Sequence, residues 1–389
     1  MSNIRKKIIV VTTTLDAGGI TSFLIPLVNL LLSEGHYVSL AYTKDNGKFL
    51  SRFKSGLNYI QYNTLSKKQS VTKCILNGRI YDILNIFFRK HTSLPPYSSS
   101  QRIGYVSAEN TFITSEYYDI AISTAEGFCN CVVANQITAN KKIGWVHPDM
   151  GAIGLDKKAG LRILNKLDLI VCVSQVGCNS LKSIFPNAES KFICIENIID
   201  NESIRLRAAE EVSDLPKSVC HRKIVTVCRI DNCSKRLDRV IRICKLLKEK
   251  EFSFVWTVVG DGPDYENVRQ QISAEGLTNE LRLIGKKLNP LPYVKDADVF
   301  ILTSQYEGKP VAVEEAKVLH KPIIVTEYTS AKNQVPKDMG AVVSNEDGIL
   351  EEEIVKIVMN DRWINYIYAS NMLYEYNNQP SVDLIKSII

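Results

Sequence analysis

The sequence of 389 residues lacks any apolar run long enough to cross a membrane, for which about 18 to 20 residues are needed. The apolar run near its start, residues 8–11, is short and ends in threonines, so a first buried strand is a better interpretation than a signal peptide. We therefore expect a cytoplasmic protein, with peripheral binding at the inner face of the cell membrane as a further option.

Cysteine patterns typical of metal sites are lacking as well. The chain has 10 cysteines but no Cys-x-x-Cys, and its closest pairs, Cys129 with Cys131 and Cys228 with Cys233, do not have the spacing of a zinc site. Without a secretion signal, these cysteines indicate a reducing compartment, in which thiols are most often small buried apolar groups. We interpret all ten as structural.

The strong positive charge of nucleic-acid-binding proteins is also missing. Residues 1–200 hold 22 basic and 14 acidic residues, a net charge of +8, whereas residues 201–389 hold 26 and 28, a net charge of −2. The excess is small and no aromatic RNA-binding motif accompanies it, so we expect no nucleic acid partner. The basic first half instead favours an anionic acceptor or lipid headgroups.

What the sequence does contain is a regular alternation of short β-branched runs with amphipathic segments. Runs that are apolar on both faces and separated by helices predict parallel sheets covered on both sides. They form two series, at residues 7–12, 37–43, 118–123, 142–147, 169–174 and 192–196, and at residues 223–227, 254–259, 281–284, 299–303 and 323–326. The sequence therefore predicts an α/β protein with two Rossmann-like domains, joined by a charged segment with a short helix over residues 201–210.

Amphipathic patterns outside the strands indicate helices. In the helix predicted to begin at Lys235, apolar residues recur from Leu237 at three- and four-residue steps, and the polar face is assigned Lys235, Arg236, Asp238 and Arg239.

Two further segments leave alternatives open. Residues 65–115 are basic, and the helical pattern over residues 73–90 fits either a helix on a membrane surface or a core helix with solvated flanks. The tail after Trp363 is rich in apolar and aromatic residues and is expected to pack on one of the domains.

Polar residues that directly follow strands are candidates for a binding site, because ligands of open parallel sheets bind beyond the carboxyl ends of the strands. Gly18 and Gly19 follow the first strand and precede an apolar helix, a turn that lets the backbone approach an anion. The full Gly-x-Gly-x-x-Gly is missing, which counts against a dinucleotide cofactor. His147 ends the strand at residues 142–147, either as a structural histidine or as part of the site.

Basic residues follow the first strand of the second series. Arg229 and Lys235 supply a guanidinium and an ammonium near a helix start, and together these can neutralise a diphosphate as it leaves. The alternative is that both are ordinary solvent-facing basic residues, which are common. The turn Gly260-Asp261-Gly262, after the next strand, either caps its helix or contacts the ligand.

The most informative segment is residues 304–316, directly after a predicted strand. Gly308 allows close approach of a ligand, Pro310 suits a first helical turn, and seven residues separate Glu307 from Glu315. A carboxylate can accept both hydroxyls of a ribose, and unpaired amides at a helix start can bind phosphate or sugar oxygens. Compensation of the helix dipole explains one glutamate in a first turn, but not the whole segment.

With these residues the sequence resembles family 4 of the retaining glycosyltransferases, whose GT-B fold has two Rossmann-like domains facing across a cleft. The resemblance covers nearly the whole chain, and its most specific part is the string from Glu307 to Ala316, which matches the family's E-x7-E motif. The other matching positions are Gly18-Gly19, Trp145-Val146-His147, Val173-Ser174, Glu196-Asn197 near Asp200, Arg229 with Lys235, and Gly260-Asp261-Gly262. Ile198 departs from the family, because relatives often have a hinge glycine there.

The resemblance implies a role for each of these residues. Glu315 would hold the donor ribose, Glu307 would lie at the donor sugar, and Arg229 and Lys235 would bind the diphosphate. His147 would line the reaction centre from the first domain. The catalytic set is thus His147, Glu307, Arg229 and Lys235, and the donor-binding set is Gly18, Gly19, Arg229, Lys235, Gly260, Gly262, Glu307, Gly308, Lys309, Pro310 and Glu315.

The resemblance also implies the domain organisation and the need for cofactors. Residues 1–200 would form an acceptor-binding domain, residues 201–370 a nucleotide-sugar-binding domain, and residues 371–389 a helix that packs on the first domain. The family needs no metal or other cofactor, so we expect none.

These implications together predict an enzyme that transfers a hexose from a nucleotide diphosphate sugar, with UDP as the first choice, to a saccharide with retained anomeric configuration. The basic first half and the helical pattern at residues 73–90 favour a lipid-linked acceptor, as in the assembly of bacterial capsule, exopolysaccharide or O-antigen. The alternatives are a non-catalytic GT-B partner subunit of another transferase and a nucleotide-sugar epimerase. A partner subunit would not need the complete set of Arg229, Lys235, Glu307 and Glu315.

Overall fold

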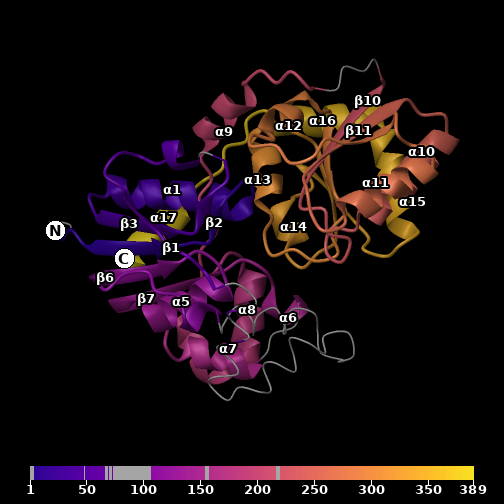
Figure 1. Ribbon diagram of the computed structural model, residues 1–389. Helices are drawn as coiled ribbons and strands as arrows, with labels where there is room; N and C mark the ends of the chain where they lie inside the picture. Colours follow the sequence, from indigo (N-terminus) through magenta and orange to yellow (C-terminus); the bar gives the residue numbers. More distant parts are fainter. Residues whose placement is uncertain are drawn as a thin grey trace. The chain divides into compact units, whose positions relative to one another are not determined.

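A computed structural model of the chain describes residues 4–47, 49–65, 69, 72, 107–153, 157–215 and 220–389 (Figure 1). The chain divides into two compact units. The first comprises Met1–Asp16, Ile20–Ile198 and Gln379–Ile389, and the second comprises Ala17–Gly19 and Ile199–Asn378. The helical pattern predicted at residues 73–90 lies outside the described residues.

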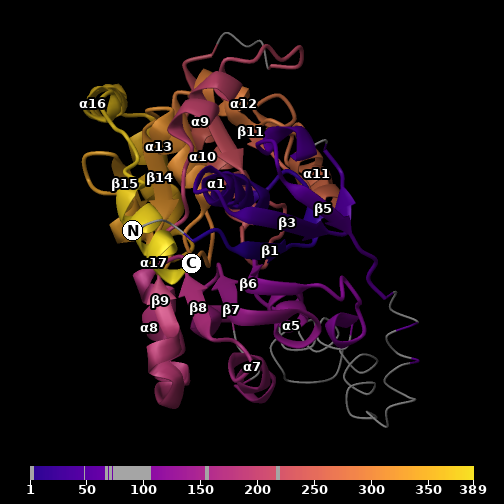
Figure 2. The ribbon, with the colours of Figure 1, turned by 90° about the vertical axis from the view of Figure 1, so that its left-hand side faces the viewer.

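The first unit is built on a seven-stranded parallel sheet in the order β5-β3-β1-β6-β7-β8-β9, and Figure 2 shows its strands side by side. Most of these strands are buried along much of their length because both faces of the sheet are covered, which accounts for the continuous apolar runs in the sequence. The strands are β1 (Lys7–Val11), β3 (Tyr37–Tyr42), β5 (Asn58–Gln61), β6 (Tyr117–Ser123), β7 (Thr138–Val146), β8 (Leu169–Cys172) and β9 (Phe192–Cys194).

Helices and two short strands complete the first unit. The two short strands, β2 (Thr14–Leu15) and β4 (Lys44–Asp45), pair with each other beyond the carboxyl ends of β1 and β3. The helices are α1 (Gly19–Ser33), η1 (Phe49–Arg52), α5 (Phe128–Gln136), α6 (Met150–Ile153), α7 (Lys157–Leu164), α8 (Gln175–Ile184), η2 (Pro186–Lys191) and α17 (Gln379–Ile388).

The second unit has a six-stranded parallel sheet in the order β12-β11-β10-β13-β14-β15. Its strands are β10 (Arg222–Val227), β11 (Phe254–Val259), β12 (Leu281–Leu283), β13 (Val299–Leu302), β14 (Ile323–Thr326) and β15 (Gly340–Val343). Its helices are α9 (Asn201–Ala208), α10 (Leu237–Glu249), α11 (Tyr265–Ala274), α12 (Leu291–Asp296), α13 (Val311–Val318), α14 (Ala331–Gln334), α15 (Ile349–Val358) and α16 (Asp361–Asn371).

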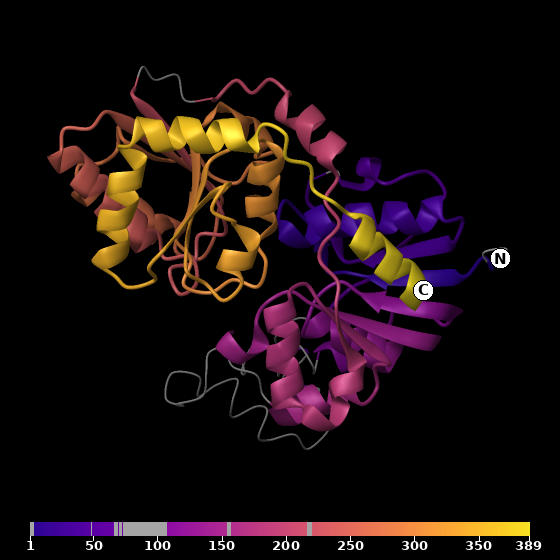
Figure 3. The same ribbon diagram turned by 180° about the vertical axis from the view of Figure 1, so that it is seen from behind.

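The links between the units differ slightly from the sequence-based boundaries. The first unit ends at Ile198, and α9 falls within the predicted helix at residues 201–210, with Asp200 capping it through a hydrogen bond from the Ser203 amide. At the other end, α16 stays in the second unit, and the chain rejoins the first unit at Gln379 rather than at residue 371 (Figure 3). The segment after α16 stays in the second unit because Tyr376 is buried in one cluster with Leu291 and Val311 of that unit.

The order of the strands in each sheet defines where a ligand can bind. In the second unit the chain runs from β10 outward to β11 and β12, then returns to β13 on the other side of β10. In the first unit the same reversal occurs between β1 and β6. Such switch points leave a crevice at the carboxyl ends of the two strands, where ligands of open parallel sheets bind.

Among the described residues, no helix combines the length and the apolar character that crossing a bilayer requires.

Candidate active site

Lys235 and Glu307 meet at the switch point of the second unit. Lys235 lies in the loop between β10 and α10, Glu307 lies in the loop between β13 and α13, and the ammonium forms an ion pair with the carboxylate. Their side chains are only 19% and 10% exposed. The hydroxyl of Ser304, which is fully buried, also donates to the carboxylate of Glu307 at 2.7 Å. The structure therefore brings together two of the residues singled out from the sequence.

The electrostatics of this pair keep Lys235 charged. Burial disfavours its ammonium, but the carboxylate of Glu307 outweighs this effect, and the pKa of Lys235 is raised above its ordinary value. A cation is thus held where the carboxyl ends of β10 and β13 lie next to each other. Ser304 was not a candidate from the sequence, although it begins the informative segment.

Glu315 lies on α13, eight residues beyond Glu307, and is 8% exposed. Its charge acts on Arg207 of α9: burial lowers the pKa of Arg207, and Glu315 partly opposes this. The two glutamates of the E-x7-E motif thus have different neighbours, Lys235 for Glu307 and Arg207 for Glu315.

The start of α13 is fixed by hydrogen bonds to its carbonyl groups. Pro310 is the residue before the helix, the Ser330 hydroxyl donates to the carbonyl of Gly308, and Gln334 Nε2 donates to the carbonyl of Pro310 at 2.9 Å. These hydrogen bonds fix the backbone just before α13, and this in turn fixes the direction of the first backbone amides of the helix. The side chain of Lys309 lies over the ring of Tyr376, 5.5 Å from its centroid.

Gly260 and Gly262 support the loop that carries Arg229. A Cβ at Gly260 would lie 1.8 Å from the carbonyl oxygen of Cys228, and a Cβ at Gly262 would lie 2.1 Å from that of Ile230. The Ile230 amide donates to the carbonyl of Asp261 at 3.0 Å. Close packing of two loops therefore accounts for both glycines. Arg229 itself is exposed at the end of β10.

In the first unit, His147 follows β7 and is half-buried. Its Nε2 lies 2.8 Å from the carbonyl oxygen of Thr124, and its ring packs edge-on against Phe23 of α1. A carbonyl can only accept, so Nε2 carries the proton. Burial lowers the pKa of His147, although Glu126 opposes the shift, so the neutral imidazole dominates at neutral pH. Thr124 follows β6 at the switch point, where its amide bonds to the carbonyl of Val11 at 3.1 Å.

Gly18 and Gly19 stand where β2 leads into α1. A Cβ at Gly18 would have no atom within 4 Å, and its φ lies outside the left-handed region. Neither packing nor backbone conformation therefore requires a glycine at this position.

The chain contains one Asp-x-Asp sequence, Asp296-Ala297-Asp298, a pattern that can hold a metal. Here both carboxylates serve the amino end of β10 instead: Asp298 accepts from the Lys223 amide at 2.7 Å, and Asp296 pairs with the Lys223 ammonium at 3.1 Å. This is the end of the sheet opposite Lys235 and Glu307, so the two aspartates belong to the fold and not to the candidate site.

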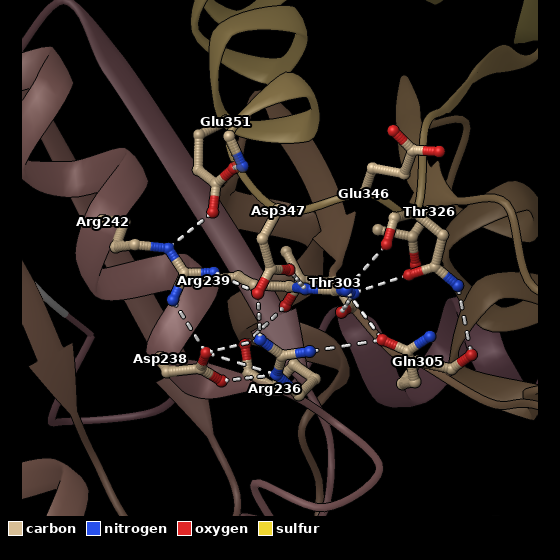
Figure 4. A network of polar contacts seen from close by, with 12 residues as sticks. Arg236, Asp238, Arg239, Arg242, Thr303, Gln305, Thr326, Glu346, Asp347 and Glu351 are labelled. Carbon is tan, nitrogen blue, oxygen red and sulfur yellow. Dashed lines mark hydrogen bonds and ion pairs between the residues drawn. The ribbon is translucent and has the colours of Figure 1, made fainter.

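A network of arginines and acids contacts the loop after β13 through Thr303 and Gln305 (Figure 4). Its centre is Arg239, which is 1% exposed, contrary to its sequence-based assignment to the polar face of α10. The prediction was wrong because α10 is covered on a second side, where α15 packs against it. Ile243 lies one turn further along α10 and is also fully buried. This apolar residue was the sequence signal that the Arg239 side of the helix is covered.

Comparisons with known proteins show similarity to glycosyltransferases. Residues 210–369 match the family model described as glycosyl transferases group 1. The chain is 22% identical over 187 residues to the poly(ribitol-phosphate) alpha-N-acetylglucosaminyltransferase of Staphylococcus aureus, covering 47% of this chain and 38% of that protein. It is 26% identical over 132 residues to the amylovoran biosynthesis glycosyltransferase AmsK of Erwinia amylovora, covering 32% of each. The chain spans less than half the length of the curated relatives it matches.

The fold is similar to solved structures over almost the whole chain. The crystal structure of Anabaena HepE in complex with UDP and glucose has a TM-score of 0.67 at 14% sequence identity, with 99% of both chains covered. The predicted α/β fold of the GT-B class is thereby confirmed.

Proposed function

We propose that this chain transfers a sugar from a UDP-sugar to a saccharide acceptor, and the match of residues 210–369 to the family model of glycosyl transferases group 1 supports this. The observation that carries the proposal is the contact of Lys235 with Glu307 at the switch point of the second unit. The resemblance assigned one residue to the diphosphate and the other to the sugar. The two residues in contact would lie where the diphosphate of the donor joins its sugar. The bond between these two groups is the one that transfer breaks.

The chemistry of the pair suits this bond. As the diphosphate leaves, negative charge builds on it, and a fixed cation in a partly buried site stabilises that charge without reorganisation. An ammonium has three donors, so Lys235 can keep its bond to Glu307 while it contacts phosphate oxygens. We assign Glu307 to the hydroxyls of the donor sugar, and Glu315 on α13 to the donor ribose.

The remaining roles follow from the same premise. Arg229 is exposed at the end of β10 and is available to bind a diphosphate. We assign neutral His147 of the first unit to the catalytic residues. We propose that transfer retains the anomeric configuration, supported by the E-x7-E motif, and that it needs no metal. UDP as the donor nucleotide is supported by the similarity in fold to HepE, whose crystal structure is a complex with UDP and glucose.

The acceptor is proposed to be a saccharide of a cell-surface polymer, carried on a lipid. Support for a polymer comes from two relatives, one named a poly(ribitol-phosphate) alpha-N-acetylglucosaminyltransferase and the other an amylovoran biosynthesis glycosyltransferase. The net charge of +8 on residues 1–200 supports an anionic acceptor or membrane surface. The cytoplasmic face of the membrane is the location that fits such a lipid-linked acceptor.

The experiment is a screen of UDP-glucose, UDP-galactose, UDP-N-acetylglucosamine and UDP-N-acetylgalactosamine for an increase in melting temperature, because binding stabilises the folded chain by mass action. UDP release is then measured with free and lipid-linked oligosaccharides, with and without EDTA. We expect acceptor-dependent release that EDTA does not change. Lys235→Ala is expected to lower turnover by at least about tenfold in a folded protein.

Each alternative gives a different result in the same screen. Interconversion of the UDP-sugar without an acceptor would identify an epimerase. No stabilisation by any of the four UDP-sugars would contradict a UDP-sugar donor and favour a partner subunit. Near-normal transfer by Lys235→Ala would refute the assigned site while leaving the transferase activity in place.

A further inference from the structure

Arg239 uses all five of its N–H donors while fully buried (Figure 4). Nε donates to Asp347 at 2.8 Å. Nη1 donates to the Thr303 carbonyl at 3.0 Å and to Asn345 Oδ1 at 2.7 Å. Nη2 donates to Gln305 Oε1 at 2.7 Å and to the Asn345 carbonyl at 2.9 Å. One side chain of α10 therefore binds the loop after β13 and the loop after β15 at once.

The loop after β13 leads from these bonds to Glu307. Thr303 and Gln305 flank Ser304. Arg239 donates to the backbone carbonyl of Thr303 and to the side chain of Gln305, so it fixes the loop on both sides of Ser304. Ser304 is further fixed by Thr326, whose hydroxyl donates to the Ser304 carbonyl at 2.5 Å. The Ser304 hydroxyl then donates to Glu307. The carboxylate is thus oriented by a short chain of buried contacts that starts at Arg239.

The same loop also holds Lys235. The Gln305 amide donates to the Ser234 carbonyl at 2.7 Å, and the Thr303 hydroxyl lies 3.2 Å from the Lys235 carbonyl. The next residue, Arg236, has a φ of 55°, in the left-handed region that costs a non-glycine residue about 1 kcal/mol or more. Its guanidinium bonds to Gln305 Oε1 at 3.2 Å, the acceptor that Arg239 also uses. Both members of the ion pair therefore depend on Thr303 and Gln305.

From this geometry we infer that Arg239 is a positioning residue for glycosyl transfer: it sets the loop on which Glu307 stands against the loop on which Lys235 stands, without itself touching the donor. The inference rests on the proposed function, because it concerns how that site is built. An arginine suits the task, since its planar fork reaches acceptors in several fixed directions, which an ammonium cannot do.

A purely structural role predicts something different. Buried ion pairs are often no more stabilising than apolar residues of the same volume, so stability alone does not explain why five acceptors from two loops converge on one buried arginine. Under the structural reading, a conservative replacement lowers the melting temperature and leaves the folded site unchanged. Under the positioning reading, it changes how the folded site binds a diphosphate.

The experiment compares Arg239→Lys with Arg222→Lys. Arg222 is also a buried arginine of the second unit, but it bonds to the Val358 carbonyl and Asp361 at the amino end of β10, away from the site. UDP, GDP, ADP and dTDP are ranked by stabilisation of the wild-type chain. Affinities for the best diphosphate and for its nucleoside are then measured below the melting temperature. Lys235→Ala is the reference, and Gln305→Met, which removes the shared acceptor, is the second variant.

We expect Arg239→Lys and Gln305→Met to lower the affinity for the diphosphate roughly tenfold while the nucleoside affinity changes by less than about twofold. Arg222→Lys is expected to lower the melting temperature only. If Arg239→Lys binds the diphosphate as tightly as Arg222→Lys does, and Lys235→Ala does not, the positioning role is wrong and the proposed site stands. If Lys235→Ala binds the diphosphate normally, the assigned site is wrong. If no diphosphate binds the wild-type chain, the proposed function itself is wrong. Should Arg239→Lys fail to fold, Gln305→Met decides the question.

Discussion

Single residues of the same type can be required for different reasons, and Gly18 and Gly260 illustrate this. A Cβ at Gly260 would collide with the Cys228 carbonyl, whereas a Cβ at Gly18 would meet no atom within 4 Å. Gly260→Ala is therefore expected to destabilise the second unit by about 1 to 3 kcal/mol, a drop of several degrees in melting temperature. Gly18→Ala is expected to keep the melting temperature but to weaken stabilisation by UDP-sugars, because a ligand would approach the backbone there.

The two alanine variants serve as controls for each other in one thermal-shift series, with and without the donor. An unchanged response of Gly18→Ala to the donor would remove Gly18 from the donor site. A loss of stability in Gly18→Ala without donor would mean that the glycine serves packing instead.

At the scale of elements, α13 carries two adjacent glutamates with different surroundings. Glu314 is 2% exposed, accepts from Gln334 Nε2 at 3.0 Å and pairs with the Lys317 ammonium at 3.0 Å. Removing one partner of a buried ion pair costs about 3 to 5 kcal/mol, so Glu314→Gln should lower the melting temperature markedly. Glu315→Gln should instead weaken donor binding, because an amide cannot accept both ribose hydroxyls at full strength.

Measuring melting temperature and UDP affinity for both variants separates these roles. The outcome against the assignment is a Glu315→Gln protein that binds UDP normally. A Glu314→Gln protein that keeps its stability but loses UDP binding would exchange the roles of the two glutamates.

The elements also show how far the sequence alone could lead. The central strands were predicted because both of their faces are apolar. β5 was missed because most of its residues are exposed, and β15 because it begins with glycine and alanine, which are poor strand formers. Glu307 and Glu315 were found because their spacing is fixed along one loop and helix. Arg239 was not found, because its partners Thr303 and Asn345 are 64 and 106 residues away in the chain. Hydrogen bonds between residues so far apart in the sequence form only in the folded chain, so local spacing does not predict them.

At the scale of the whole molecule, the chain visits the first unit twice. Its last helix, α17, packs there through Ile385 and Ile388, and Lys386 pairs with Glu34 of the loop after α1 at 2.8 Å. The Lys141 ammonium donates to the Ile388 carbonyl at 2.6 Å. The last residues of the sequence therefore stabilise the unit formed by the first ones, and not the unit that directly precedes them.

This arrangement predicts that damage to α17 is felt far away in the sequence. Ile385 is 1% exposed, whereas its neighbour Leu384 is 37% exposed, so Ile385→Ala should cost about 2 to 5 kcal/mol and Leu384→Ala should change stability little. Because a chain with two units need not unfold in one step, the readout is hydrogen exchange resolved by segment. Exchange should quicken in β1 and β6 of Ile385→Ala and stay unchanged in β10 and β13. Faster exchange in both sheets would mean that the units unfold together, and equal behaviour of the two variants would mean that α17 does not hold the first unit.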